Sequence, residues 1–441
     1  MSVFILLRYF DLVFSPVTSA SFSPNYRAYV LFILWITYIL NFVDRQLITI
    51  LLEPIKLEFG ASDTAMGFLS GFAFALFYAS LGVPVARLAD RWSRRNVIAI
   101  SVGLWSAMTA LCGMAASFWQ LAVARVGVGI GEAGGTPPSH SLIADYFPLE
   151  QRTTALSIHA TGTQFGILIG MLGGALLAAE YGWRMAFIFF GIPGVVIGLL
   201  VAFTVKEPAR ESPLSNTSMI ADIKHIWALP GFALIATAGA TTALAAYGLG
   251  TWSPSFLMRT HGLSLVETGL LLGGAGAISG IIGAVTGGIL CDRLRKRDPR
   301  WQLWLPAVGA FTTAPLMLGF LLWPESQQFA VGDTIVPVAI VFTLLGGVVA
   351  AFWIGPTYAA IQTLSPGNMR AQAAAIFLFM FNLVGMGLGP LVIGILSDAL
   401  EPVFGVDSLR YAMAISLSLV LLGGVLFMRA APKYVTASHG S

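Results

Sequence analysis

The sequence predicts an all-α polytopic membrane protein with twelve transmembrane helices in two pseudo-symmetric six-helix bundles. Three observations predict this class: 57% of the 441 residues are hydrophobic, only 10% are charged, and the mean hydropathy is +0.82. Soluble domains carry about 25% charged residues, so this composition cannot cover the surface of a soluble protein of this length. It excludes a soluble enzyme, a nucleic-acid binder and a disordered chain.

Twelve stretches are long and apolar enough to cross a bilayer, which takes roughly 20 mostly apolar residues. They are 28–52, 65–87, 96–116, 119–144, 153–180, 185–205, 230–258, 267–290, 302–323, 335–362, 371–398 and 409–430. The connections are short except for 206–229, where charged residues and prolines end the apolar pattern. The expected domains are therefore an N-terminal cytoplasmic or interfacial segment (1–27), a first bundle (28–205), a cytoplasmic linker (206–229), a second bundle (230–430) and a cytoplasmic tail (431–441).

The basic residues predict the orientation of the chain. Of the 24 Lys and Arg residues, 18 fall on the side of the termini, two lie within spans, and four lie on the opposite side, namely Lys56, Arg184, Arg259 and Arg410. The positive-inside rule then places both termini in the cytoplasm, with the chain multi-pass in a cytoplasmic (inner) membrane. Apolar residues at helical spacing from Phe4 to Phe14 fit either a short helix on the inner membrane surface or an unordered extension.

Three short motifs recur in the same order on equivalent loops of the two halves. They are Asp90-Arg91 with Asp292-Arg293, Pro148-x-x-x-Arg152 with Pro366-x-x-x-Arg370, and Trp183-Arg184 with Leu409-Arg410. Two six-helix halves of the same topology form a known transporter architecture, in which the substrate site lies between the halves near the membrane midplane.

The loop from Ala86 to Arg95 resembles the cytoplasmic signature of the major facilitator superfamily, although Ala86 and Ser93 stand where glycines are usual. Within that superfamily the chain resembles the Spinster family of lysolipid and sphingolipid transporters. The resemblance rests on Asp44-Arg45, on Arg125-Val-Gly-Val-Gly-Ile-Gly-Glu132-Ala and on Asp145-Tyr-Phe-Pro followed by Arg152. It implies the major facilitator fold, alternating access and proton coupling.

Four charged residues lie within spans of the first half: Asp44, Arg45, Arg125 and Glu132. Each costs ~2.5–3.5 kcal/mol on insertion scales and therefore needs a partner or a wet cavity. Asp44 and Arg125 should lie at similar depth, whereas Arg125 and Glu132 share one helix face about 10 Å apart along its axis. A charge network facing a central cavity is one interpretation, and a permanent ion pair locking the first span to the fourth is the other.

For the network, Glu132 is the candidate proton carrier and Asp44 the second candidate. Glu132 is nearest the middle of the membrane, where burial favours the neutral carboxyl and a nearby guanidinium favours the carboxylate. Arg45 or Arg125 is expected to bind an anionic headgroup through bidentate hydrogen bonds. In the expected cycle, protonation of Glu132 weakens its hold on Arg125.

The second half offers no comparable charges within its spans. The expected polar and aromatic cavity residues are Asn41, Thr241, Tyr247, Trp252, Tyr358, Gln362 and Asn382. A cavity with one charged and one uncharged wall suits an amphiphile with a single ionic head.

The family resemblance implies a cytoplasmic gate, although these charges can also serve only to set the topology. The gate residues are Asp90, Arg91, Arg94, Arg95, Arg152, Asp292, Arg293 and Arg370. Gly162, Gly166, Gly170 and Gly174 recur every fourth residue and predict a face of close helix packing. His140 and His159 are interpreted as packing residues, with a proton relay as the alternative.

We expect a monomeric secondary active transporter for an amphiphilic anion, such as a lysophospholipid or a sphingosine-phosphate-like lipid, coupled to protons. No nucleic-acid partner is expected at a net charge of only +3. No metal or cofactor is expected, and the chain has no Walker loop and no HExxH pattern. Two alternatives stay open: a proton-coupled transporter of a small soluble organic anion or drug, and a non-transporting membrane sensor or scaffold.

Overall fold

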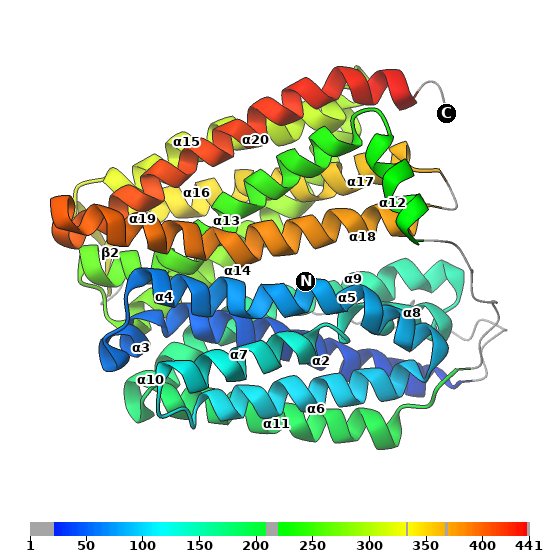
Figure 1. Ribbon diagram of the computed structural model, residues 1–441, viewed down its shortest axis with the longest axis horizontal. Helices are drawn as coiled ribbons and strands as arrows, with labels where there is room; N and C mark the ends of the chain where they lie inside the picture. The colour runs from blue at the N-terminus through cyan, green and yellow to red at the C-terminus, as the bar shows by residue number, and fades with distance from the viewer. Residues whose placement is uncertain (1–21, 209–218, 332–333, 367–368, 439–441) are drawn as a thin grey trace.

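Two helical bundles lie side by side in the computed structural model, which describes residues 22–208, 219–331, 334–366 and 369–438 (Figure 1). The segment from Phe4 to Phe14, for which a surface helix was one expectation, lies outside the described residues. Because both bundles expose apolar side chains on their outer faces, the fold is stable only where a bilayer covers them.

The first bundle contains six rods, some of them divided into shorter helices. They are α2 (Pro24–Ile50); α4 (Asp63–Gly67), η1 (Phe68–Phe72) and α5 (Ala73–Arg91); α6 (Arg94–Cys112); α7 (Phe118–Glu132) and α8 (Thr136–Tyr146); α9 (Leu149–Leu168), η2 (Ile169–Gly173) and α10 (Gly174–Tyr181); and α11 (Trp183–Thr204). The short helix α3 (Leu52–Phe59) joins the first rod to the second.

The second bundle repeats this plan after α12 (Met219–Ala228), a helix within the linker. Its rods are α13 (Phe232–His261); α14 (Leu265–Leu294); α15 (Trp301–Leu322); α16 (Ala339–Ala350), η3 (Ala351–Trp353) and α17 (Ile354–Leu364); α18 (Arg370–Met380), η4 (Phe381–Leu388) and α19 (Gly389–Phe404); and α20 (Ser408–Ser438). Two antiparallel strands, β1 (Gln328–Val331) and β2 (Thr334–Pro337), follow α15, and the turn η5 (Gly405–Asp407) precedes α20.

Ten stretches of the described chain are long and apolar enough to cross a membrane. The tenth, Gln372–Ala437, spans both the α18–α19 rod and α20, and the α7–α8 rod is interrupted at residues 133–135. When Gln372–Ala437 is counted as two rods and the interrupted α7–α8 rod is added, the described chain has twelve rods, as the sequence predicts. The interruption has a local cause, because Pro137 lies in the first turn of α8, where proline starts a helix readily.

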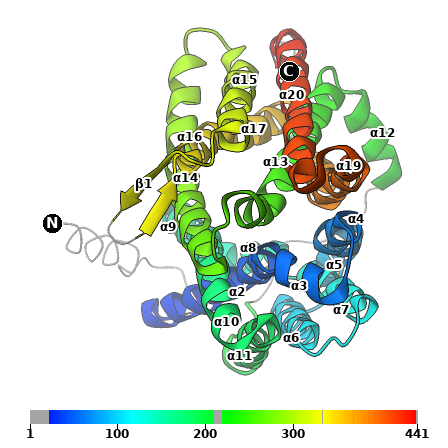
Figure 2. The same ribbon diagram turned by 90° about the vertical axis from the view of Figure 1, so that its left-hand side faces the viewer.

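The rods run between two opposite ends of the molecule. The hairpin end carries α3, the β1–β2 hairpin and η5, and it faces the viewer in Figure 2. The linker end carries the start of α2, the α5–α6 and α8–α9 turns and α12, at the right of Figure 1. Neither α12 nor the hairpin is predicted by the sequence. Ile226 anchors α12, since it is fully buried in the core of the second bundle.

The predicted glycine face is confirmed, and it fixes α2 against α9. A Cβ atom on Gly166 would lie 2.5 Å from the Cβ of Phe42, and one on Gly170 would lie 2.6 Å from the Cβ of Gln46. Only glycine permits helices to approach this closely. The contact holds the middle of α2, which carries Asp44 and Arg45, in a defined position.

Candidate functional site

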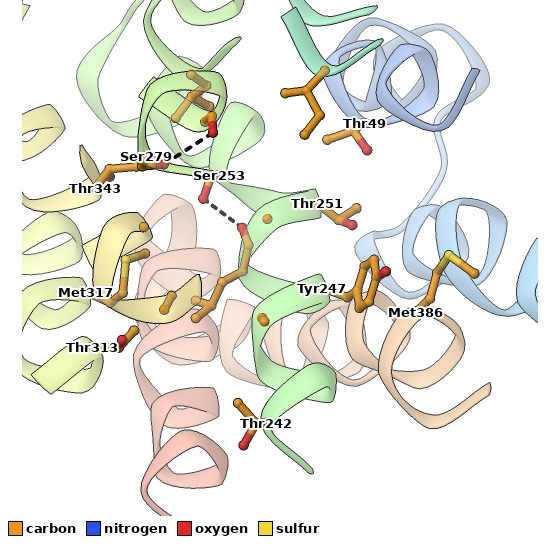
Figure 3. A pocket seen from close by; sticks show the side chains of 18 of the residues that line it. Thr49, Thr242, Tyr247, Thr251, Ser253, Ser279, Thr313, Met317, Thr343 and Met386 are labelled. Atoms are coloured by element: carbon orange, nitrogen blue, oxygen red, sulfur yellow. Dashed lines mark hydrogen bonds between the residues drawn. The ribbon is translucent and has the colours of Figure 1, made fainter. Parts of the chain in front are cut away.

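A cavity of about 350 Å³ lies between the two bundles and is lined by both (Figure 3). The charged residues among its lining are Arg45 and Arg125, which both belong to the first bundle. The second bundle contributes apolar side chains, the ring of Tyr247 and hydroxyl-bearing residues: Thr242, Thr251, Ser253, Ser279, Thr313 and Thr343. The predicted division into a charged and an uncharged wall is therefore present in this cavity.

The four charged residues form two ion pairs, each of which joins α2 to α7. Glu132 Oε2 accepts a hydrogen bond from Nε of Arg45 at 2.9 Å, and Nη2 of the same guanidinium lies 2.8 Å from that oxygen. Asp44 Oδ2 lies 2.6 Å from Nη1 of Arg125, and its Oδ1 accepts a hydrogen bond from the hydroxyl of Thr109. The expectation that Asp44 and Arg125 lie at similar depth is confirmed.

The expected hold of Glu132 on Arg125 is wrong, because Glu132 pairs with Arg45. Residues seven apart on one helix are about 10 Å apart along the axis, so Arg125 and Glu132 reach separate partners on the neighbouring helix. Side chains on a helix point toward its N-terminus. The long side chain of Arg45 therefore extends along α2 toward the linker end, where it meets Glu132.

The two pairs differ in exposure. The side chains of Asp44 and Arg125 are 3% and 1% exposed, so that pair is almost fully buried, although Arg125 is among the residues lining the cavity. The side chain of Glu132 is fully buried, but that of Arg45 is 14% exposed and lines the cavity. Glu132 Oε1 is buried and has no hydrogen-bond partner among the described residues. Of the two arginines that line the cavity, Arg45 is thus the more exposed.

Arg45 sits at the boundary between the bundles. Its guanidinium lies 4.7 Å from the ring centre of Tyr78 and 5.3 Å from those of Phe42 and Phe74, which stabilises the cation. Its Nη1 lies 3.9 Å from the sulfur of Met386 on η4 of the second bundle. A change at Arg45 therefore alters contacts with both bundles.

Charged side chains join the two bundles at the hairpin end. Arg259 at the end of α13 bonds Glu53 at 2.8 Å and Asp63 through two hydrogen bonds of 2.8 Å, and Lys56 bonds Asp63 at 2.7 Å. Ser397 on α19 donates to Asp63 Oδ2 at 2.7 Å. The sequence does not predict this cluster, although Lys56 and Arg259 are two of the four cations that it places on the side opposite the termini.

The bundle backbones also touch at the hairpin end. A Cβ atom on Gly67 would lie 2.5 Å from the carbonyl oxygen of Pro390, and one on Gly394 would lie 2.3 Å from that of Asp63. Ion pairs and close glycine contacts together join the two bundles at this end.

At the linker end, the predicted gate residues Arg94 and Arg95 bond within the first bundle and to the linker. Arg94 donates to Glu207 and to Ser141, both at 2.9 Å, and pairs with Asp145. Burial raises the pKa of Glu207, but hydrogen bonds from the Arg95 backbone N–H and from the Arg94 and Ser93 side chains hold it below its usual value.

The remaining predicted gate residues form no described contact between bundles. Asp292 lies 3.3 Å from Arg295 on its own helix, and Arg293 and Arg370 are exposed. Arg152 is half-buried, with no partner for its Nε among the described residues. The side chains of Asp90 and Arg91 lie outside the described residues.

Of the seven expected polar and aromatic cavity residues, Tyr247 lines this cavity. Trp252 is fully buried and donates to the carbonyl oxygen of Pro390 at 2.9 Å, so its expected place in the cavity is wrong. The others, Asn41, Thr241, Tyr358, Gln362 and Asn382, are absent from its lining. The sequence does not reveal which face of an uncharged helix looks into a cavity and which looks toward lipid.

His140 and His159 occupy a packed cluster, as the preferred interpretation expects. The ring of His159 stacks on Tyr38 with centroids 4.5 Å apart and lies 5.2 Å from that of His140. No group of three potential metal ligands occurs in the described part of the chain.

Comparisons with known proteins agree with this architecture. A family model described as Major Facilitator Superfamily matches residues 34–386. An MFS-type efflux pump of Mycolicibacterium smegmatis is 37% identical over 90% of both chains. Protein spinster homolog 1 of Xenopus tropicalis is 28% identical over 93% of this chain and 81% of its own length. The sphingosine-1-phosphate transporter SPNS2 of Danio rerio is 25% identical, covering 89% and 82%.

Among solved structures, a bacterial homologue of the human lysosomal transporter Spinster, in an inward-facing and unoccupied conformation, superimposes with a TM-score of 0.82. It is 29% identical, and the match covers 93% of this chain and 98% of the other. These matches confirm the predicted fold and a transporter rather than an enzyme. The chain belongs to the Major Facilitator Superfamily and is related to the Spinster proteins within it.

Proposed function

We propose that this chain is a monomeric, proton-coupled transporter of an amphiphilic anion, either a lysophospholipid or a sphingosine-phosphate-like lipid. It works by alternating access in a cytoplasmic membrane, with the linker end in the cytoplasm. The observation that carries the proposal is Arg45 on the cavity wall, paired with the buried Glu132 and opposite a wall of uncharged residues. Relatives named as Spinster and sphingosine-1-phosphate transporters support the lipid-like substrate class.

The cavity has a shape and chemistry that suit an amphiphile. Arg45 offers a guanidinium at its boundary with the first bundle, and guanidinium groups bind phosphate bidentately. On the other side the cavity continues among α13, α15, α16 and α20, where Met317, Ala310, Val420 and Gly347, together with Thr313 and Thr343, form an uncharged and largely apolar recess. Figure 3 shows Met317 and Thr343 on the opposite side of the cavity from Thr49. A headgroup at Arg45 directs an acyl chain into this recess.

A proton on Glu132 is proposed to couple substrate binding to the cycle. Protonation removes the negative charge that holds Arg45, and the unpartnered Oε1 can carry the proton. Arg45 is then available to a phosphate in the cavity. When Glu132 loses its proton, it draws Arg45 back and the anion loses its partner. This cycle replaces the one that paired Glu132 with Arg125.

Asp44 and Arg125 take a different part in this proposal from the one expected from the sequence. Both side chains are almost fully buried and paired with each other, so Arg125, although it lines the cavity, is already held by Asp44. We assign them a structural role, as the ion pair that fixes α2 to α7 and holds Arg45 in place.

The conformation described here is proposed to be open toward the linker end. The ion pairs of Arg259 and the glycine contacts close the hairpin end, and the matched Spinster homologue is inward-facing. Alternating access requires that the contacts at the hairpin end break in the other half of the cycle.

The proposal is tested by flux of a labelled lysophospholipid in proteoliposomes, with and without an imposed pH gradient. We expect gradient-driven flux in the parent, its loss in Glu132→Gln, and parental flux in the control Glu180→Gln, which alters an exposed carboxylate. If the rate of flux is the same with and without the pH gradient and is unchanged in Glu132→Gln, proton coupling is contradicted.

A second candidate substrate is a small soluble organic anion or drug, which the name of the M. smegmatis relative as an efflux pump favours. Competition for binding separates the two. If a soluble anion displaces a bound probe and lysophospholipids do not, the substrate is the soluble anion. If neither binds to folded protein, the sensor or scaffold alternative gains support.

A further inference from the structure

Asp398 is a carboxylate of the second bundle that caps a helix of the first. It lies on α19, and its two oxygens accept hydrogen bonds from the backbone N–H groups of Asp63 at 2.9 Å and of Thr64 at 2.8 Å. These are the first two residues of α4, where the second span begins. The cap therefore crosses the boundary between the bundles at the hairpin end.

The first turn of α4 depends on this cap. The first N–H groups of a helix have no partner within it. Ser62 supplies two acceptors locally: its hydroxyl accepts from Ala65 at 3.2 Å and its carbonyl from Met66 at 3.0 Å. The N–H groups of Asp63 and Thr64 are left, and the described residues offer them only Asp398.

Charge adds to the strength of the cap. A helix N-terminus carries a partial positive charge that favours a carboxylate. In the described cluster, Lys56 and Arg259 bond the carboxylates of Glu53 and Asp63, whereas Asp398 bonds the backbone N–H groups of α4. The N-terminus of α4 therefore supplies the positive potential at Asp398.

We propose that Asp398 is a positioning residue that latches the hairpin end shut and sets the register of α19 on α4. An ion pair between long side chains tolerates a range of helix positions, whereas two backbone N–H groups fix both oxygens of a short carboxylate. Neighbouring contacts follow that register: Ser397 reaches the Asp63 carboxylate, and Gly394 packs on the Asp63 carbonyl. The inference depends on the proposed alternating access, because it states what must be released when this end opens.

The test measures the distance between the bundles directly. Spin labels are placed at Leu57→Cys on α3 and Val406→Cys on η5, which are 75% and 82% exposed at the hairpin end. The native Cys112 and Cys291 are buried. The parent is expected to give a single short distance. Asp398→Ala removes the cap and is expected to add a longer distance, with the open-to-closed ratio raised about fivefold, as for the loss of a helix cap.

Two further variants separate the latch from a general effect on folding. Asp398→Asn keeps the size of the side chain but leaves one oxygen to accept a hydrogen bond. Its NH₂ group then faces one of the two backbone N–H groups of α4, and two donors cannot bond each other. We therefore expect this variant to open the hairpin end as Asp398→Ala does. Asp398→Glu keeps the carboxylate and should largely restore the closed distance. The matched control is Glu401→Gln, an exposed carboxylate about one turn further along α19, which should match the parent.

The inference is overturned if Asp398→Asn gives the parental distance while Arg259→Gln, in the same labelled background, shows the longer one. Should Asp398→Ala not fold, the Asn and Glu variants still decide the question. The experiment uses neither lipid nor a pH gradient. A failure of the proposed transport activity therefore leaves its result unaffected, and a failure of the latch leaves the flux assay unaffected.

Discussion

Glu132 Oε2 accepts a hydrogen bond from Nε of Arg45 and forms an ion pair with its Nη2, and the other oxygen, Oε1, is buried without a partner among the described residues. A buried carboxylate oxygen without a hydrogen bond is costly, and a proton placed there removes the charge. Arg45 of this pair borders the cavity and, through Met386, the second bundle. In the proposed function the pair therefore connects a proton, a ligand and the interface between the two bundles.

The buried pair of Asp44 and Arg125 is predicted to be structural. Removing one partner leaves a buried charge unpaired, so Asp44→Ala should lower the free energy of unfolding by about 3–5 kcal/mol. The double change Asp44→Leu with Arg125→Met removes both charges and should recover most of that loss. Thermal unfolding in detergent micelles measures both effects. A double variant no more stable than the single one would contradict the structural role.

Arg45 is predicted to bind the anionic headgroup. Arg45→Gln should reduce the affinity for a lysophospholipid at least tenfold, because the cation that remains in the cavity lining, Arg125, is almost fully buried and paired with Asp44. A neutral amphiphile with the same acyl chain should bind equally well to the parent and the variant. Calorimetric titration with both ligands makes the comparison. If both ligands lose affinity equally, the variant has damaged the cavity and the headgroup assignment fails.

Glu207 is predicted to make stability depend on pH through its clasp on Arg94 and Arg95. The pKa of Glu207 in the folded protein lies below the usual value that it has in the unfolded chain. Its contribution to the free energy of unfolding is therefore fully present above the usual pKa and is lost as the pH falls through the lower, folded-state pKa. At pH 7 Glu207→Gln should melt at a lower temperature than the parent, and the difference should shrink as the medium becomes strongly acidic. Melting temperatures measured from pH 7 to pH 3 test this. A difference that is constant with pH would contradict it.

The glycine face of α9 is predicted to be sensitive to a single methyl group. Gly166→Ala places a Cβ atom 2.5 Å from the Cβ of Phe42, which forces α9 from α2 and should cost about 1–3 kcal/mol. Gly274→Ala is the matched control, because a Cβ atom there meets nothing within 4 Å. Equal melting temperatures for the two variants would show that the helices can adjust without cost.

Much of the fold could be predicted from the sequence, because apolar length and glycine spacing are local signals. The spans, the glycine face of α9 and the shared depth of Asp44 and Arg125 all follow from them. The partner of Glu132 could not be predicted in this way, because it depends on the direction in which the side chain of Arg45 extends along α2. The charge count also reveals cations such as Arg259 without indicating which bundle they meet.

The contacts at the two ends were harder to predict for a different reason. Asp398 binds backbone N–H groups, which every residue carries, so no pattern of side chains marks its partners. Glu207 lies in a linker whose charges were interpreted only as the end of a span. In both cases the partner is more than 100 residues away, and only the folded arrangement brings the two together.

The most direct test of the account is whether a lysophospholipid gradient moves protons through Glu132. Proteoliposomes loaded with a pH-sensitive dye would receive the lipid on one side at equal pH on both sides. The account predicts a change of internal pH with the parent and with Glu180→Gln, and none with Glu132→Gln, although that variant is folded and binds the lipid. Proton movement that persists in Glu132→Gln would contradict the assignment of the carrier, and lipid flux without proton movement in the parent would contradict coupling itself.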